Sequence, residues 1–166
     1  MRITRRAAIG TAAVSTLAAV ALVTAIACSD DATGPGDAGD AGLQWSPAPA
    51  VFPPGAEMAV VQGDPGATAL FTVRLRFPDG YRLPPHTHPT DEHVTVIRGT
   101  FLVGMGATFD ANALQALGAG GFVTAPANHA HYAAARGPTV VQVHALGPFA
   151  LTYVNPSDAP SQAHVR

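Results

Sequence analysis

The chain has 166 residues and 48% of them are apolar, which is enough to bury the core of one domain. All nine basic residues are Arg, and with 11 acidic residues the net charge is −2, which excludes a basic surface for nucleic acid. The 17 Gly and 15 Pro favour short strands and turns over long helices, so the composition predicts an all-β domain.

The first 27 residues have the pattern of an export signal. Arg2, Arg5 and Arg6 form a positive start, an apolar run follows, and small residues precede Cys28. The apolar run is long enough that an uncleaved membrane helix is the competing interpretation, but Thr, Ser and Gly dilute its hydropathy. We therefore predict a signal peptide over residues 1–27 and an exported protein.

The residues before Cys28 resemble a bacterial lipobox. They read Ala25-Ile26-Ala27, with Ala25 standing where Leu is usual. The resemblance implies that the Cys28 thiol is lipidated and anchors the protein to a membrane of the cell envelope. The alternative is a soluble periplasmic or secreted protein. Residues 4–9 are also similar to a twin-arginine signal, with general export as the other route.

The next segment, residues 28–50, is rich in Asp, Ala, Gly and Pro and has little to bury. We predict that it is a flexible tether behind the lipidated cysteine. Trp45 is an exception, and we expect it to dock on the domain as its first ordered residue. The domain itself is predicted over residues 51–156, and residues 157–166 are predicted to be a frayed tail.

Alternation of apolar and polar residues predicts the strands of this domain. It is clearest in residues 69–77, where Phe71, Val73, Leu75 and Phe77 alternate with polar positions. Further strands are predicted over 58–62, 94–105, 139–146 and 149–154, with a hairpin at Arg98-Gly99. Residues 108–117 are predicted to form the one short helix, with Asp110 as its cap and Gly118 at its end.

One predicted strand region contains two histidines and a carboxylate within seven positions. If residues 86–97 are extended, alternate side chains share a face, so His86, His88 and Glu92 lie together. Imidazole nitrogen and carboxylate oxygen suit a divalent first-row metal ion. The alternative is a polar loop whose histidines face water.

A second group of histidines follows a turn marked by Pro126 and Asn128, where Asn can take the left-handed backbone. His131 begins or ends a strand and would be the fourth protein ligand. His129 shares the parity of His131 and is a candidate to line the same cavity, with an exposed turn histidine as the alternative. His144 is a candidate proton-transfer residue near the metal, with a hydrogen-bonded core histidine as the alternative.

Together the two stretches resemble the motifs of the cupin family, G-x5-H-x-H-x3,4-E-x6-G and G-x5-P-x-G-x2-H-x3-N. The first motif is matched at Gly80, His86, His88, Glu92 and Gly99. The second is matched at Gly120, Pro126 and His131, while Asn128 and Ala135 replace its later Gly and its Asn. The resemblance covers residues 50–155 and implies a small antiparallel jelly-roll barrel with one short helix between the motifs.

The resemblance also implies that His86, His88, Glu92 and His131 bind one divalent ion of iron, manganese, zinc, nickel or copper. Four protein ligands leave a position open for chemistry. We therefore predict a metal-dependent enzyme, dioxygenase-like or isomerase-like, acting on a small molecule. The alternative is a non-catalytic module that binds or senses a metal or a small ligand. Other expected contacts are with the membrane, through the lipid anchor only, and with a second copy in a homodimer.

Overall fold

The computed structural model describes residues 39–160, so the signal predicted over 1–27 and the lipidation predicted at Cys28 lie outside the described residues. Within this part no helix is long and apolar enough to cross a bilayer. The strands are β1 (Ser46–Pro47), β2 (Glu57–Gln62), β3 (Leu70–Phe77), β4 (Arg82–Thr87), β5 (Glu92–Met105), β6 (Gln115–Leu117), β7 (Phe122–Ala125), β8 (His131–Leu146) and β9 (Thr152–Tyr153). Two 3-10 helices are η1 (Ala111–Ala113) and η2 (Pro156–Asp158).

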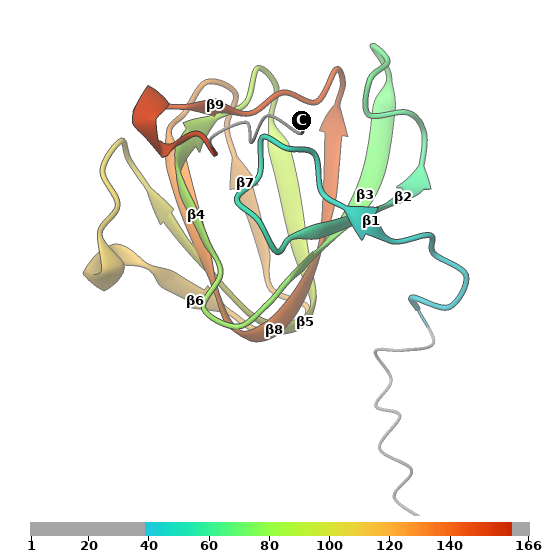
Figure 1. Cartoon of the computed structure of the whole chain (residues 1–166), viewed down its shortest axis with the longest axis horizontal. Coiled ribbons are helices and arrows are strands. Elements are labelled where there is room, and N and C mark those ends of the chain that lie inside the picture. The colour runs from blue at the N-terminus through green and yellow to red at the C-terminus, as the bar shows by residue number, and fades with distance from the viewer. Residues whose placement is uncertain (1–38, 161–166) are drawn as a thin grey trace, which may run out of the picture. The chain divides into compact units, whose positions relative to one another are not determined.

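The strands form one antiparallel sheet that curls around the core (Figure 1). Strand β8 holds it together, because its 16 residues pair with β4 at their start, with β3 at their end and with β5 along most of their length. Strand β5 also pairs with β6 and β7. The prediction of an all-β, antiparallel jelly-roll barrel is confirmed.

The inner face of the sheet is apolar, as the alternation in the sequence predicts. On β3 the side chains of Phe71, Val73, Leu75 and Phe77 are all buried in the core, and strands β5 and β8 of the same sheet contribute valines to it. Burial of this surface is the main stabilising contribution to such a barrel. At one end of the apolar interior lie the predicted ligand residues.

The helix predicted over residues 108–117 is present only as the three-residue 3-10 helix η1 (Ala111–Ala113), so its predicted length is wrong. The segment makes only the turn η1, which Asp110 caps as predicted by accepting a hydrogen bond from the Asn112 amide at 2.8 Å. It then becomes β6, which pairs with β5 from Phe101 to Val103. A short isolated helix is only marginally stable, so the backbone hydrogen bonds that β5 offers determine the conformation of residues 115–117.

The hairpin predicted at Arg98-Gly99 is also wrong, because β5 runs through it. The register of β5 against β8 shifts on both sides of Arg98, so the strand is bulged here and not reversed. Gly99 has φ of +80°, and a Cβ atom there would lie 2.4 Å from the carbonyl oxygen of Pro138. Asn128 takes the predicted left-handed backbone with φ of 58°.

Residues 39–50, the described end of the predicted tether, make contacts with the barrel. Asp40 forms ion pairs with Arg74 of β3 and Arg98 of β5, and the guanidinium of Arg76 lies 3.9 Å from the centre of the Trp45 ring. Trp45 therefore docks as predicted, but ordered chain precedes it. At the other end, η2 extends one turn into the predicted tail, with Asn155 as its cap.

Candidate metal centre

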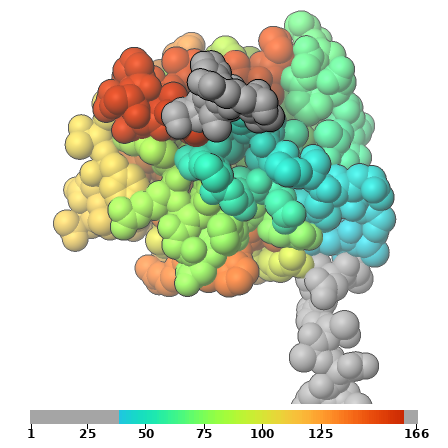
Figure 2. Space-filling model, viewed as in Figure 1, coloured from blue at the N-terminus to red at the C-terminus, as the bar shows by residue number. Residues whose placement is uncertain are grey.

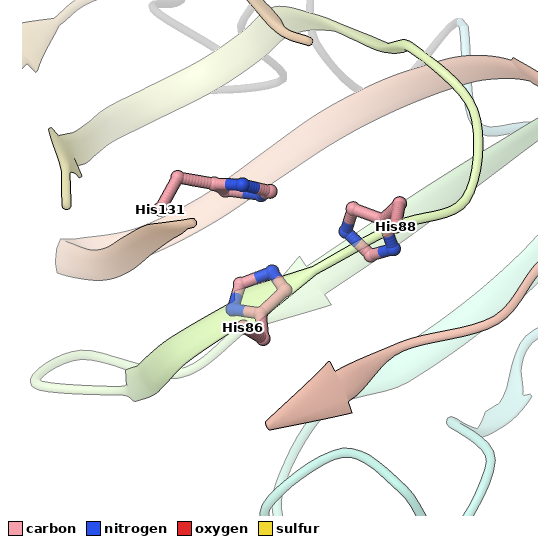
Figure 3. Close-up of side chains that lie close together, drawn as sticks. All are labelled: His86, His88 and His131. Atoms are coloured by element: carbon pink, nitrogen blue, oxygen red, sulfur yellow. The ribbon is translucent and has the colours of Figure 1, made fainter. Parts of the chain in front are cut away.

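Three strand ends bring the predicted ligands together. His86 lies on β4, His88 follows that strand, Glu92 is the first residue of β5 and His131 is the first residue of β8. His86 and His131 are paired in register across β4 and β8. Figure 3 shows the three imidazole rings pointing toward one another.

The side chains lie close enough together that the three histidines could hold a metal ion. The histidines each offer a nitrogen within 4.8 Å of the others. The Oε2 atom of Glu92 lies 3.4 Å from Nε2 of His131 and 3.6 Å from Nε2 of His88. All four residues are buried, with exposed fractions between 1% and 8%.

Backbone carbonyls fix the orientation of all three rings. The Nδ1 atoms of His86, His88 and His131 lie 2.7 Å, 2.7 Å and 3.1 Å from the carbonyl oxygens of Pro84, Ala150 and His129. A carbonyl only accepts, so each Nδ1 carries the proton and donates it. Each Nε2 therefore presents a lone pair, which is how metal-binding histidines are usually held.

One nitrogen in the cluster has no hydrogen-bond partner. Nε2 of His131 is buried and unpaired, although it lies beside the Glu92 carboxylate. With the proton on Nδ1, a lone pair faces a carboxylate oxygen, and neither atom has a proton to share. A bound cation between them would satisfy both, so the donor set fits a metal ion. Among residues 39–160 the three histidines are the one group of at least three His, Cys, Asp or Glu side chains that lie close enough together to hold an ion.

The electrostatics keep His86 neutral and the Glu92 carboxylate charged. Burial, and then the neighbouring His131 and His88, lower the pKa of His86 to about 3. Burial alone would raise the pKa of Glu92, but the neighbouring imidazoles of His131, His88 and His86 outweigh it and lower that pKa. Neutral imidazole and ionised carboxylate are the forms that coordinate metals.

The lowered pKa of His86 predicts how the metal-free protein responds to acid. Below pH 6.5 the unfolded chain binds a proton at His86, while the native state does not until about pH 3. Stability is therefore lost as the pH falls through this window, by up to about 1.4 kcal/mol per pH unit from this residue. Glu92, with its lowered pKa, acts in the same direction.

Urea unfolding of metal-stripped protein from about pH 7 to about pH 4 measures this slope. The His86→Gln variant is the control, because it lacks the titrating ring. We expect the slope of its unfolding free energy against pH to be smaller by about the contribution of one bound proton. Equal slopes in the two proteins would contradict the neutral, buried state of His86.

An apolar cavity of about 20 Å³ adjoins the ligands. Apart from the four ligand residues its walls are aliphatic and aromatic, contributed by Phe52, Leu75, Phe77, Leu83, Val94, Phe101, Ala133, Val141, Val143 and Leu151. The space is enough for about one water molecule. An ion bound by these residues would have an open coordination position that faces this narrow, apolar cavity.

The two other predicted histidines have different positions. The side chain of His129 is exposed, and this residue reaches the centre through its backbone carbonyl. His144 is exposed on the opposite face of β8 from the cavity, where its Nδ1 lies 2.9 Å from Oγ1 of Thr72. The structure therefore does not bring the His144 ring to the ligands. Sequence reasoning missed Phe52, which has no periodic pattern around it to indicate a position in the site.

Comparison with known proteins agrees with this fold. A family model described as the ChrR cupin-like domain matches residues 40–150. No curated protein sequence matches the chain significantly.

Solved structures with the same fold include three proteins of different kinds. A candidate acetylacetone dioxygenase from Methylibium petroleiphilum PM1 is 22% identical, with a TM-score of 0.55 over 71% of this chain and 79% of that one. A polyketide cyclase from Streptomyces resistomycificus is 17% identical, with a TM-score of 0.54 over 64% and 76% of the two chains. An oxalate oxidase is 20% identical, with a TM-score of 0.50 over 66% and 60%. At these identities the likeness establishes the barrel alone.

Proposed function

This chain belongs to the ChrR cupin-like domain family, and from its buried ligand set we propose that it holds one divalent first-row metal ion and acts through it on a small molecule. His86, His88 and His131 would supply Nε2 atoms, and Glu92 a carboxylate oxygen. The observation that carries the proposal is the unpaired Nε2 of His131 beside the Glu92 carboxylate, because that arrangement lacks only a cation.

The residues around the ligands have roles that follow from their contacts. The carbonyls of Pro84, Ala150 and His129 hold the rings in one tautomer and orientation. The apolar walls exclude water from the open position. A bound ion would supply Lewis acidity or oxygen activation there, which is the chemistry of a dioxygenase-like or isomerase-like enzyme. The names of two fold relatives, a candidate dioxygenase and an oxalate oxidase, favour the oxidative form.

A test of catalysis uses the full chain loaded in turn with iron, manganese, copper, nickel and zinc. Acetylacetone and oxalate, the molecules named for two fold relatives, are the probes, and oxygen uptake and probe loss are measured. Consumption that stops on chelation and returns with metal supports the enzyme. Metal-loaded protein that leaves both probes and oxygen unchanged favours the second function.

The second function is a non-catalytic module that binds a metal or a small ligand. The cavity favours it, because about 20 Å³ leaves no room for an organic substrate in this conformation. Besides Glu92 and the three histidines, no residue that lines the cavity is an acid or a base. A binding module of this kind needs only the metal ligands and no separate catalytic acid or base.

We also propose that the protein is exported and anchored through a lipid on Cys28, which the lipobox-like sequence supports. In a bacterial host, labelled palmitate should enter the wild-type protein and be absent from Cys28→Ser. Ser29→Ala is the matched control and should keep its label. Equal labelling of wild type and Cys28→Ser would contradict the anchor.

A further inference from the structure

The loop between β1 and β2 crosses the face of the barrel. It comprises residues 48–56 and is closed at its base by a hydrogen bond of 2.9 Å from the Ala48 amide to the Ala56 carbonyl. In Figure 1 it is the teal segment that runs across the sheet, and in Figure 2 its atoms lie on the same face. We call residues 48–56 the plug loop.

The tip of the plug loop contributes Phe52 to the candidate metal centre. The Phe52 side chain is only 4% exposed and lines the cavity together with the four ligands. Its ring stacks on Phe149 with centroids 6.2 Å apart, and Phe149 stacks on the ring of His88 at 5.3 Å. One column of aromatic rings therefore extends from the plug loop to a metal ligand.

Two tyrosines from the barrel hold the loop on either side of Phe52. The hydroxyl of Tyr153 donates to the Val51 carbonyl at 2.7 Å, and that of Tyr81 donates to the Pro53 carbonyl at 2.9 Å. Burial, and then Asp158, raise the pKa of Tyr153 to about 12, and burial and Tyr153 raise the pKa of Tyr81 further. Both hydroxyls thus stay protonated and keep donating at neutral pH.

From this arrangement we propose that Phe52 determines the size of ligand admitted to the metal. With the plug loop closed, the open position accepts water or a diatomic molecule, because the remaining cavity is about 20 Å³. Ring-sized molecules reach it only when the loop lifts and Phe52 leaves the aromatic column. This inference rests on the proposed metal site, and it makes Phe52 a specificity-determining residue.

The first test compares a small and a large metal ligand in the iron(II)-loaded full chain. Nitric oxide binding, detected by electron paramagnetic resonance, should be the same in wild type and in Phe52→Ala. Imidazole, followed by its competition with nitric oxide, should bind to Phe52→Ala at least about ten-fold more tightly than to wild type. Phe122→Ala is the matched control, because Phe122 is 57% exposed and does not line the cavity. Wild type that binds imidazole as tightly as Phe52→Ala would overturn the proposal.

A second test needs no metal. In stripped protein, benzene should raise the melting temperature of Phe52→Ala, because the lost ring leaves an apolar cavity, and should leave wild type and Phe122→Ala unchanged. If benzene stabilises Phe52→Ala but the protein binds no metal, the role of Phe52 in filling the cavity stands and the proposed metal site is wrong. If the protein binds metal but Phe52→Ala changes neither benzene nor imidazole binding, the metal site stands and the role of Phe52 is wrong.

A double variant, Tyr81→Phe with Tyr153→Phe, tests the plug if Phe52→Ala does not fold. It removes both hydroxyls that hold the loop and leaves Phe52 in place. Imidazole should then bind at least about ten-fold faster than to wild type, while the affinity for nitric oxide stays the same. Equal imidazole rates in the double variant and wild type would show that the loop does not control entry.

Discussion

Replacing His131 by alanine should remove nearly all bound metal from the protein while leaving the barrel folded. His131 supplies one of three converging nitrogens, and its Nε2 is the atom that lacks any hydrogen-bond partner. Losing even an outer contact of a metal site typically costs about 10–100-fold in affinity, and losing a direct ligand should cost at least the upper end of that range. The same result is expected for His88→Ala. Elemental analysis after dialysis against metal, with circular dichroism as the test of folding, measures both.

Two histidines outside the ligand set are matched controls for this experiment. His144→Ala should keep its metal, because the ring lies on the outer face of β8. His129→Ala should also keep it, since this residue contacts His131 through its backbone carbonyl, which alanine retains. Full metal content in folded His131→Ala, or an equal loss in His131→Ala and in both controls, would contradict the assigned ligands.

Replacing Gly99 by alanine should destabilise the protein by about 3 kcal/mol or more. Two costs combine at this position. The φ of +80° is unfavourable for any residue with a Cβ, and the new atom would lie 2.4 Å from the Pro138 carbonyl oxygen and 2.6 Å from Oγ1 of Thr139. Both neighbours lie in the middle of β8, so neither moves without disturbing the pairing of β5 with β8. Urea unfolding of metal-free protein measures the loss.

Gly80 provides the comparison that separates the two costs. Its φ of +72° is similar, but no atom lies within 4 Å of where its Cβ would be. Gly80→Ala should therefore cost only the backbone term, about 1–2 kcal/mol. If the two variants are equally destabilised, the close approach at the β5 bulge is not the reason for glycine there.

The ligand positions could be predicted from the sequence because they depend on local spacing. Alternation places His86 and His88 on one side and both are buried, but the single extended run expected over residues 86–97 is wrong, because β4 ends at Thr87 and bends at residues 89–90 lead into β5, whose first residue is the buried Glu92. The fourth ligand is 39 residues beyond Glu92, and the spacing alone does not show that the start of β8 pairs with β4. The family motifs supplied that information.

The errors occurred where a distant partner decides the conformation. Residues 115–117 form a strand because β5 offers them hydrogen bonds, and Arg98-Gly99 forms a bulge because β8 continues alongside. The plug loop has no periodic pattern, so its position over the ligands depends on Tyr81 and Tyr153, which are far away in the sequence. Propensity and periodicity describe neighbours along the chain and contain none of these contacts.

The ion pairs of Asp40 determine where a mechanical load enters the domain. Asp40 precedes β1 and the plug loop, and its carboxylate joins Arg74 of β3 to Arg98 of β5. Tension applied to the chain ahead of residue 39 is thus transferred at Asp40 to two long strands of the sheet. The segment that covers the candidate metal centre stays slack until those pairs break. A domain pulled by its N-terminal side would therefore keep residues 41–56 unloaded at low force.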